Sequence, residues 1–146
     1  MIHYTLIHNA FKCFKYLLIN RIDDPKKTME EYNFTQKREW INLHRYEWDC
    51  MALAIYFGQI EIITILMEQG ISKGSHISHI EAAIYSYRIP LAKEIIDITK
   101  EEPDMNKAIL NKGLLASAKN NNIMGLFLLI SKGTDIDPKD HFYLTI

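Results

Sequence analysis

Gly58 interrupts an otherwise apolar stretch, ALAIYFGQIEIITILMEQGIS, which runs from residue 52 to residue 72. Inside a helix, glycine costs about 1 kcal/mol relative to alanine. Just past a helix end, it readily adopts the left-handed backbone that stops the helix. We therefore expect one helix that ends at Gly58, a tight turn, and a second helix from about Ile60 to just before Gly70. Such a hairpin cannot bury both of its apolar faces alone, so the sequence predicts further copies of it.

Three other stretches of the chain match this hairpin. The copies align on a small residue in the first helix, where two helices would approach closely: Thr5, Ala54, Ala83 and Ser117. Asn9 and Asn121 replace Gly58 in two copies, and asparagine is the next-best residue for a left-handed turn. Tyr87 stands there in the third copy and departs from the pattern. One apolar position of the second helices is predicted to be core between repeats: Leu17, Leu66 and Leu129.

The pattern Leu-Ala-x-x-x-Gly-x-x-Glu-Ile-Ile-x-x-Leu-x-x-x-Gly at 53–70 resembles an ankyrin repeat, as does LLISKGTDID at 128–137. The chain is most similar to the divergent, lineage-expanded ankyrin repeats of protists, with large DNA viruses as a second possibility. The opening Thr-Pro-Leu-His signature of the family is absent. The resemblance implies an all-α, ankyrin-type α-solenoid of stacked antiparallel helix pairs in one domain, 1–146. About 3.5–4 repeats are expected from the family's period. They cover about 3–22, 50–72, 79–100 and 111–137, with an insertion at about 23–48.

The resemblance also implies a non-catalytic protein-interaction module that binds a partner protein on the concave inner-helix face. The residues two and three places after each small residue would point there: Tyr56, Phe57, Tyr85, Ser86, Lys119 and Asn120, with Ile7 and His8 in the first copy. Trp40 and Trp48 of the insertion are further candidates, because exposed tyrosine and tryptophan often anchor interfaces. The competing interpretation is that Phe57 or Tyr85 packs on the preceding repeat.

A metal-binding or hydrolytic protein that uses His76, His79 and Cys50 is the alternative. Two histidines three residues apart can share a helix face, but zinc takes three or four ligands. The same stretch also fits a capping box, in which Ser78 caps a helix and Glu81 reaches back.

Cys50 with His44 suggests a nucleophile and a base, but nothing places an oxyanion hole. The segment DIDPKD at 135–140 lacks the glycine and glutamate of a calcium loop. Because no phosphate-binding loop or nucleophile elbow occurs, we expect no enzyme activity, no metal and no cofactor.

The net charge of −1 gives no overall field to attract nucleic acid or an anionic membrane. The chain shows neither a signal peptide nor 18 consecutive apolar residues. Cys13 and Cys50 are expected to be reduced core thiols. We therefore expect a cytoplasmic protein, with the nucleus not excluded.

An apolar terminal repeat without a polar cap could pair with a second chain. Asp24-Pro25 predicts a helix start within the insertion.

Overall fold

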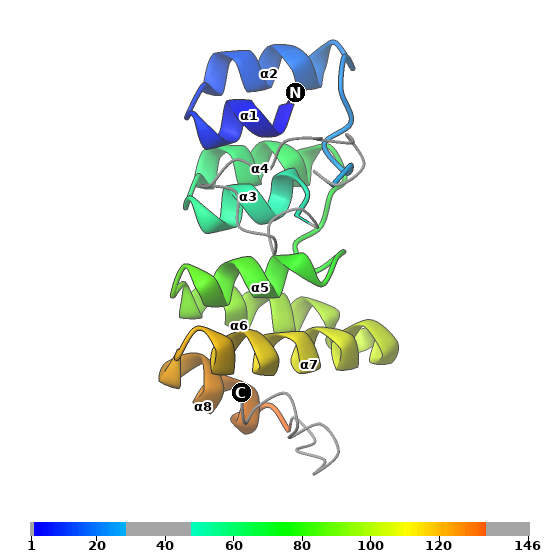
Figure 1. The fold of residues 1–146 in the computed structure, drawn as a ribbon. Helices are drawn as coiled ribbons and strands as arrows, with labels where there is room; N and C mark the ends of the chain where they lie inside the picture. The colour runs from blue at the N-terminus through cyan, green and yellow to red at the C-terminus, as the bar shows by residue number, and fades with distance from the viewer. Residues whose placement is uncertain (1, 29–47, 134–146) are drawn as a thin grey trace. The chain divides into compact units, whose positions relative to one another are not determined.

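The computed structural model describes residues 2–28 and 48–133 of the chain (Figure 1). These residues form eight α-helices and one 3-10 helix, with no strand among them, which confirms the prediction of an all-α fold. None of the helices described is long and apolar enough to cross a membrane. The chain divides into two compact units, residues 1–72 and 73–146, and each is described by itself below.

The first unit contains two helical hairpins, which Figure 1 draws as neighbouring pairs of ribbons. Its helices are α1 (Ile2–Ile7), α2 (Phe11–Ile19), α3 (Cys50–Tyr56) and α4 (Ile60–Glu68). The helix α1 packs against both α2 and α3, and α3 packs against α4. Every residue of α3 before Tyr56 is buried, so this short helix is core on all sides. Asp49 caps its start, because the Asp49 carboxylate accepts a hydrogen bond of 2.9 Å from the Ala52 amide.

The second unit contains two further hairpins. Its helices are α5 (Ser78–Tyr85), α6 (Ile89–Ile98), the 3-10 helix η3 (Thr99–Glu101), α7 (Pro103–Lys119) and α8 (Ile123–Ser131). The helix α5 packs against α6 and α7, and α8 packs against α6 and α7. The helix α7 begins at Pro103 and runs for 17 residues, so it is longer than the other first helices of the hairpins. Pro90 lies in the first turn of α6, where proline is tolerated.

All four hairpins turn in the same way. The four residues aligned with Gly58 all have a left-handed backbone, with φ between 50° and 66°: Asn9, Gly58, Tyr87 and Asn121. The amide after each of them donates to the carbonyl of the small residue five places earlier, over 2.7–2.9 Å. This is the hydrogen bond of a Schellman helix end. The register predicted from the small residues therefore holds in every copy, including the copy in which Tyr87 departs from it.

Side-chain amides link the turns of neighbouring hairpins at equivalent positions. In the first unit, Gln59 donates from Nε2 to the Leu6 carbonyl over 3.1 Å. In the second unit, Asn122 donates from Nδ2 to the Ile84 carbonyl over 3.0 Å. Both donors directly follow the left-handed residue, and both acceptors directly follow the small residue of the preceding hairpin. The same polar contact therefore recurs in both units.

Three local expectations prove wrong. Asp24 does not start a helix, because its carboxylate accepts from the Lys26 amide in a tight turn. Cys13 is exposed and is not a core thiol. Leu17 is only half-buried, because α2 turns Phe14 and Leu18 toward the core. Leu66 and Leu129, its equivalents, are fully buried as expected.

Candidate functional site

Three aromatic side chains of the first unit form a cluster at the end of α3, and they differ in how far they are exposed to solvent. Trp48 is fully buried, Tyr56 is half-buried, and Phe57 is 37% exposed. The ring of Tyr56 lies 5.4 Å from that of Trp48 and 5.1 Å from that of Phe57, measured between ring centres. The Tyr56 and Phe57 rings meet edge to face, an arrangement that aromatic pairs favour. The cluster therefore presents a rigid aromatic edge to solvent, with Trp48 beneath it as support.

The equivalent residues of α5 are Tyr85 and Ser86, both half-buried. Burial, together with the nearby charge of Glu81, raises the pKa of the Tyr85 hydroxyl, so Tyr85 stays neutral at physiological pH. The Ser86 hydroxyl donates to the Ala82 carbonyl over 2.7 Å. Its donor is thus already used within its own hairpin, and Tyr85 offers the larger surface of the two.

At the end of α7, Lys119 is exposed and Asn120 is half-buried. The Asn120 side chain donates to the carbonyls of Ile84 and Tyr85, and the Asn120 backbone carbonyl accepts from the Tyr87 hydroxyl over 3.0 Å. Asn120 therefore clamps two hairpin turns together. In the first copy, Ile7 is half-buried and His8 is exposed.

The predicted site residues fall in both units. Tyr56, Phe57 and Trp48 come together in the first unit, whereas Tyr85, Ser86 and Asn120 come together in the second. Trp40 lies outside the described residues. Trp48 is fully buried, so it supports the cluster from below and presents no surface of its own.

The side chains of His76 and His79 accept hydrogen bonds from backbone amides at the start of α5. The Nδ1 atom of His79 accepts from the Gly74 amide over 2.9 Å, and that of His76 accepts from the Ser78 amide over 3.1 Å. The predicted capping box is therefore wrong. The first residue of α5 is Ser78 itself, and Glu81 pairs with Lys112 at 3.2 Å.

These two histidine rings lie 6.2 Å apart, centre to centre, and each already has one nitrogen bonded. Within residues 2–28 and 48–133, no three metal-ligating side chains gather closely enough to hold an ion. Burial, reinforced by the charge of Asp49, raises the pKa of the Cys50 thiol well above its usual value. A thiol in that state is a poor nucleophile.

The outer face of α8 is a surface that the sequence interpretation missed. Four large apolar side chains on it are 42–63% exposed: Ile123, Met124, Phe127 and Ile130. The second helices of the other hairpins carry charges at their exposed positions, such as Lys15 in α2, Glu61 in α4 and Lys93 in α6. The segment of α8, IMGLFLLIS, has no charged residue. Alignment of the copies reveals this difference, because a surface helix usually has charged or polar residues on its outer face.

Comparisons with protein-family models, with curated proteins and with solved structures find no match. The likeness to ankyrin repeats therefore depends on the sequence pattern alone.

Proposed function

We propose that the chain is a non-catalytic protein-interaction module, an α-solenoid of the ankyrin type. Its partner is another protein, which binds on the inner-helix face of the array. The repeated turn geometry supports this proposal, because four hairpins share one closure and neighbouring turns share one amide contact. Arrays of this kind present the same register position of each copy on one face, which makes an extended binding surface.

The aromatic cluster at the end of α3 is the observation on which the proposed site depends. Tyr56 makes ring contacts with both Trp48 and Phe57, so its side chain loses little freedom on binding. Partly exposed aromatic side chains with a packed base are typical interface anchors. Tyr85 occupies the position of Tyr56 in the next copy, which belongs to the second unit.

Partner capture tests the proposal. The tagged chain is used to select proteins from a lysate of the source organism, in parallel with the variants Phe57→Ala and Tyr56→Ala/Tyr85→Ala. The matched control is Tyr16→Ala, because Tyr16 is an aromatic residue of α2 that is 63% exposed and lies outside the proposed site. We expect a protein that the wild type and the control both retain and that both test variants lose.

Folding is checked by circular dichroism and thermal melting of each variant. Phe57→Ala keeps the result interpretable if the double variant unfolds, because Phe57 is the most exposed ring of the cluster. Capture that survives in a folded Phe57→Ala protein would place the site elsewhere. Equal loss with Tyr16→Ala would show that the captured protein is not held by the aromatic cluster.

We also propose that the outer face of α8 joins two copies of the chain. Phe127 is the central residue of the nine-residue helix, so in an antiparallel pair it meets its own copy and Met124 meets Ile130 of the second copy. No charge of α8 itself would be desolvated, because the helix has none. Side chains exposed to this extent offer on the order of 500 Å² per copy. Twice that area suits a weak, reversible dimer.

A further inference from the structure

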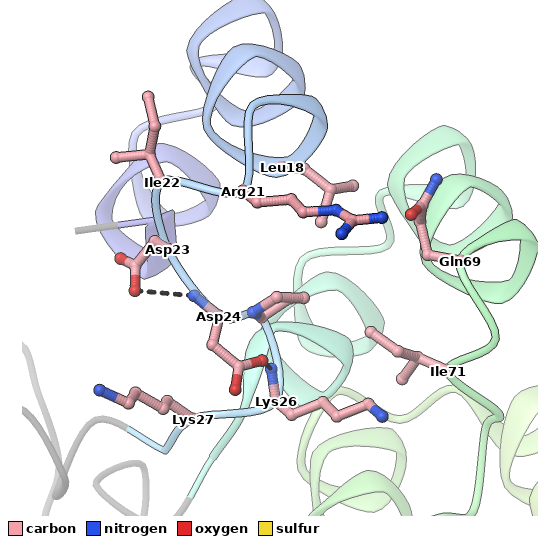
Figure 2. Close-up of a pocket in the computed structure, with 10 residues that line it drawn as sticks. Leu18, Arg21, Ile22, Asp23, Asp24, Lys26, Lys27, Gln69 and Ile71 are labelled. Carbon is pink, nitrogen blue, oxygen red and sulfur yellow. Dashed lines mark hydrogen bonds between the residues drawn. The ribbon is translucent and has the colours of Figure 1, made fainter.

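The first unit contains a pocket of about 580 Å³ between the end of α2, the following turn and the residues after α4 (Figure 2). Its lining combines apolar side chains, such as Leu18 and Ile71, with Arg21, Lys26 and Gln69. In Figure 2, the Arg21 side chain extends toward Leu18 and Gln69, and Lys26 reaches below Ile71. The lining therefore places three cations, two carboxylates and an amide beside an apolar wall.

Arg21 has a left-handed backbone at a position where two other copies have glycine. It follows the end of α2 with a left-handed φ of 52°. Gly70 and Gly133 hold the equivalent positions after α4 and α8, with φ of 85° and 82°. A side chain in this region clashes with its own backbone, whereas glycine does not. The space around Gly70 is open, so packing does not explain the glycine there. An arginine that replaces glycine at a strained position suggests a function for its side chain.

The acidic groups of the pocket already have backbone partners. Asp23 accepts from the amides of Ile2 and Asp24, each over 2.9 Å. Asp24 accepts from the Lys26 amide, also over 2.9 Å. In the part of the chain that the structure describes, the side chains of Arg21 and Lys26 form no hydrogen bond or ion pair. Their donors therefore remain available for a ligand.

We propose that this pocket binds a carboxylate side chain of a partner protein, an aspartate or glutamate with an apolar neighbour. The planar Arg21 guanidinium can donate two parallel hydrogen bonds to a carboxylate, and Lys26 adds a second positive charge. The Gln69 amide provides a further donor, while Leu18 and Ile71 contact the apolar neighbour. Only the identification of the ligand as a protein segment rests on the proposed function.

The apolar wall of the pocket favours a carboxylate side chain over inorganic phosphate. A carboxylate with an apolar neighbour can contact the cations and the wall together, whereas phosphate has no apolar group to bury against Leu18 and Ile71.

A capped tripeptide, acetyl-Leu-Glu-Leu-amide, provides the probe, and its glutamine analogue is the neutral control. Binding is followed by NMR shifts of the Arg21 Nε–H and the Gln69 side-chain amide. We expect the glutamate peptide to bind and the glutamine peptide to bind at least about tenfold more weakly, as the loss of a charge-assisted hydrogen bond implies. Inorganic phosphate, titrated in the same way, should bind no more tightly than the glutamate peptide.

The variant Arg21→Gly separates binding from folding. Glycine relieves the left-handed strain, so the melting temperature should stay the same or rise while peptide binding falls about tenfold or more. Lys12→Ala, which removes an exposed charge of α2, is the matched control and should bind like the wild type.

Equal binding by Arg21→Gly, equal shifts from both peptides, or tighter binding of phosphate would overturn the inference. These outcomes are distinct from failure of the proposed function. The latter is read from partner capture by the Phe57 variant, whose side chain does not line the pocket.

Discussion

Leu66 provides the sharpest test of the repeat register in the first unit. It is fully buried in α4, whereas Leu17, at the same position of the first copy, is half-buried in α2. If burial governs stability, the same substitution must have different effects at the two positions. We therefore compare Leu66→Ala with Leu17→Ala in the same protein.

The expected magnitudes follow from the buried surface. Leu→Ala removes three carbon groups, and burial of each is worth about 0.8 kcal/mol, so the transfer contribution at Leu66 is about 2.4 kcal/mol. A cavity that relaxes only in part raises the total loss for Leu66→Ala to about 2–5 kcal/mol. Leu17 loses about half of its transfer contribution and leaves no closed cavity, so Leu17→Ala should cost about 1 kcal/mol.

Urea denaturation measures both losses. Both tryptophans, Trp40 and Trp48, lie in residues 1–72, so their fluorescence follows unfolding of the first unit, while circular dichroism follows the whole chain. Glu68→Ala, an exposed change in the same helix as Leu66, should stay within about 0.5 kcal/mol of the wild type. A loss below about 1 kcal/mol for Leu66→Ala, or equal losses at Leu66 and Leu17, would refute the reasoning.

Two further predictions concern pH and association. Burial lowers the pKa of His3 from 6.5 to about 4, so below pH 6.5 the unfolded chain binds a proton that the folded chain binds only near pH 4. The free energy of unfolding should therefore fall by up to about 3 kcal/mol as pH falls through this window. In His3→Gln that slope should be shallower in urea denaturation, and an unchanged slope would rule out His3 as its source. Phe127→Glu should convert a concentration-dependent dimer to a monomer in sedimentation velocity, whereas Lys93→Glu, at the equivalent position of α6, should not. A wild-type monomer at all concentrations would contradict the dimer.

The hairpin turns were predictable because their chemistry is local. A small residue followed four places later by glycine or asparagine is enough to indicate a helix end with a left-handed residue. Tyr87 shows the limit of residue preference, since its φ of 58° matches that of its equivalents. The hairpin imposes this conformation, and the Tyr87 hydroxyl gains a hydrogen bond to the Asn120 carbonyl. Residue preference alone therefore underestimates how closely the turn of the third copy follows the common pattern.

Contacts that are distant in sequence could not be predicted. The spacing of Ser78 and Glu81 fits a capping box, but Glu81 pairs instead with Lys112 of α7. The error at Cys13 and Leu17 has a different cause. The segment FKCFKYLLI has apolar residues on more than one face, and only packing against α1 decides which face is buried. For the same reason, the sequence placed Ser86 and Asn120 in the site, although hydrogen bonds to the backbone already use their polar groups.

Repeats provide an internal control for function. Where copies agree, the backbone or the core explains the residue. Tyr87, Arg21 and Phe127 are three positions at which a copy departs from that agreement. Tyr87 replaces glycine or asparagine but has a structural reason, its hydrogen bond to Asn120. Arg21 replaces glycine at a strained position, and among the described residues its side chain has no hydrogen-bond or ion-pair partner. Phe127 replaces a polar residue on an outer face and is 63% exposed. Arg21 and Phe127 have no such structural reason within their own hairpins. We therefore explain Arg21 by the proposed binding of a ligand, and Phe127 by the proposed binding of a second copy.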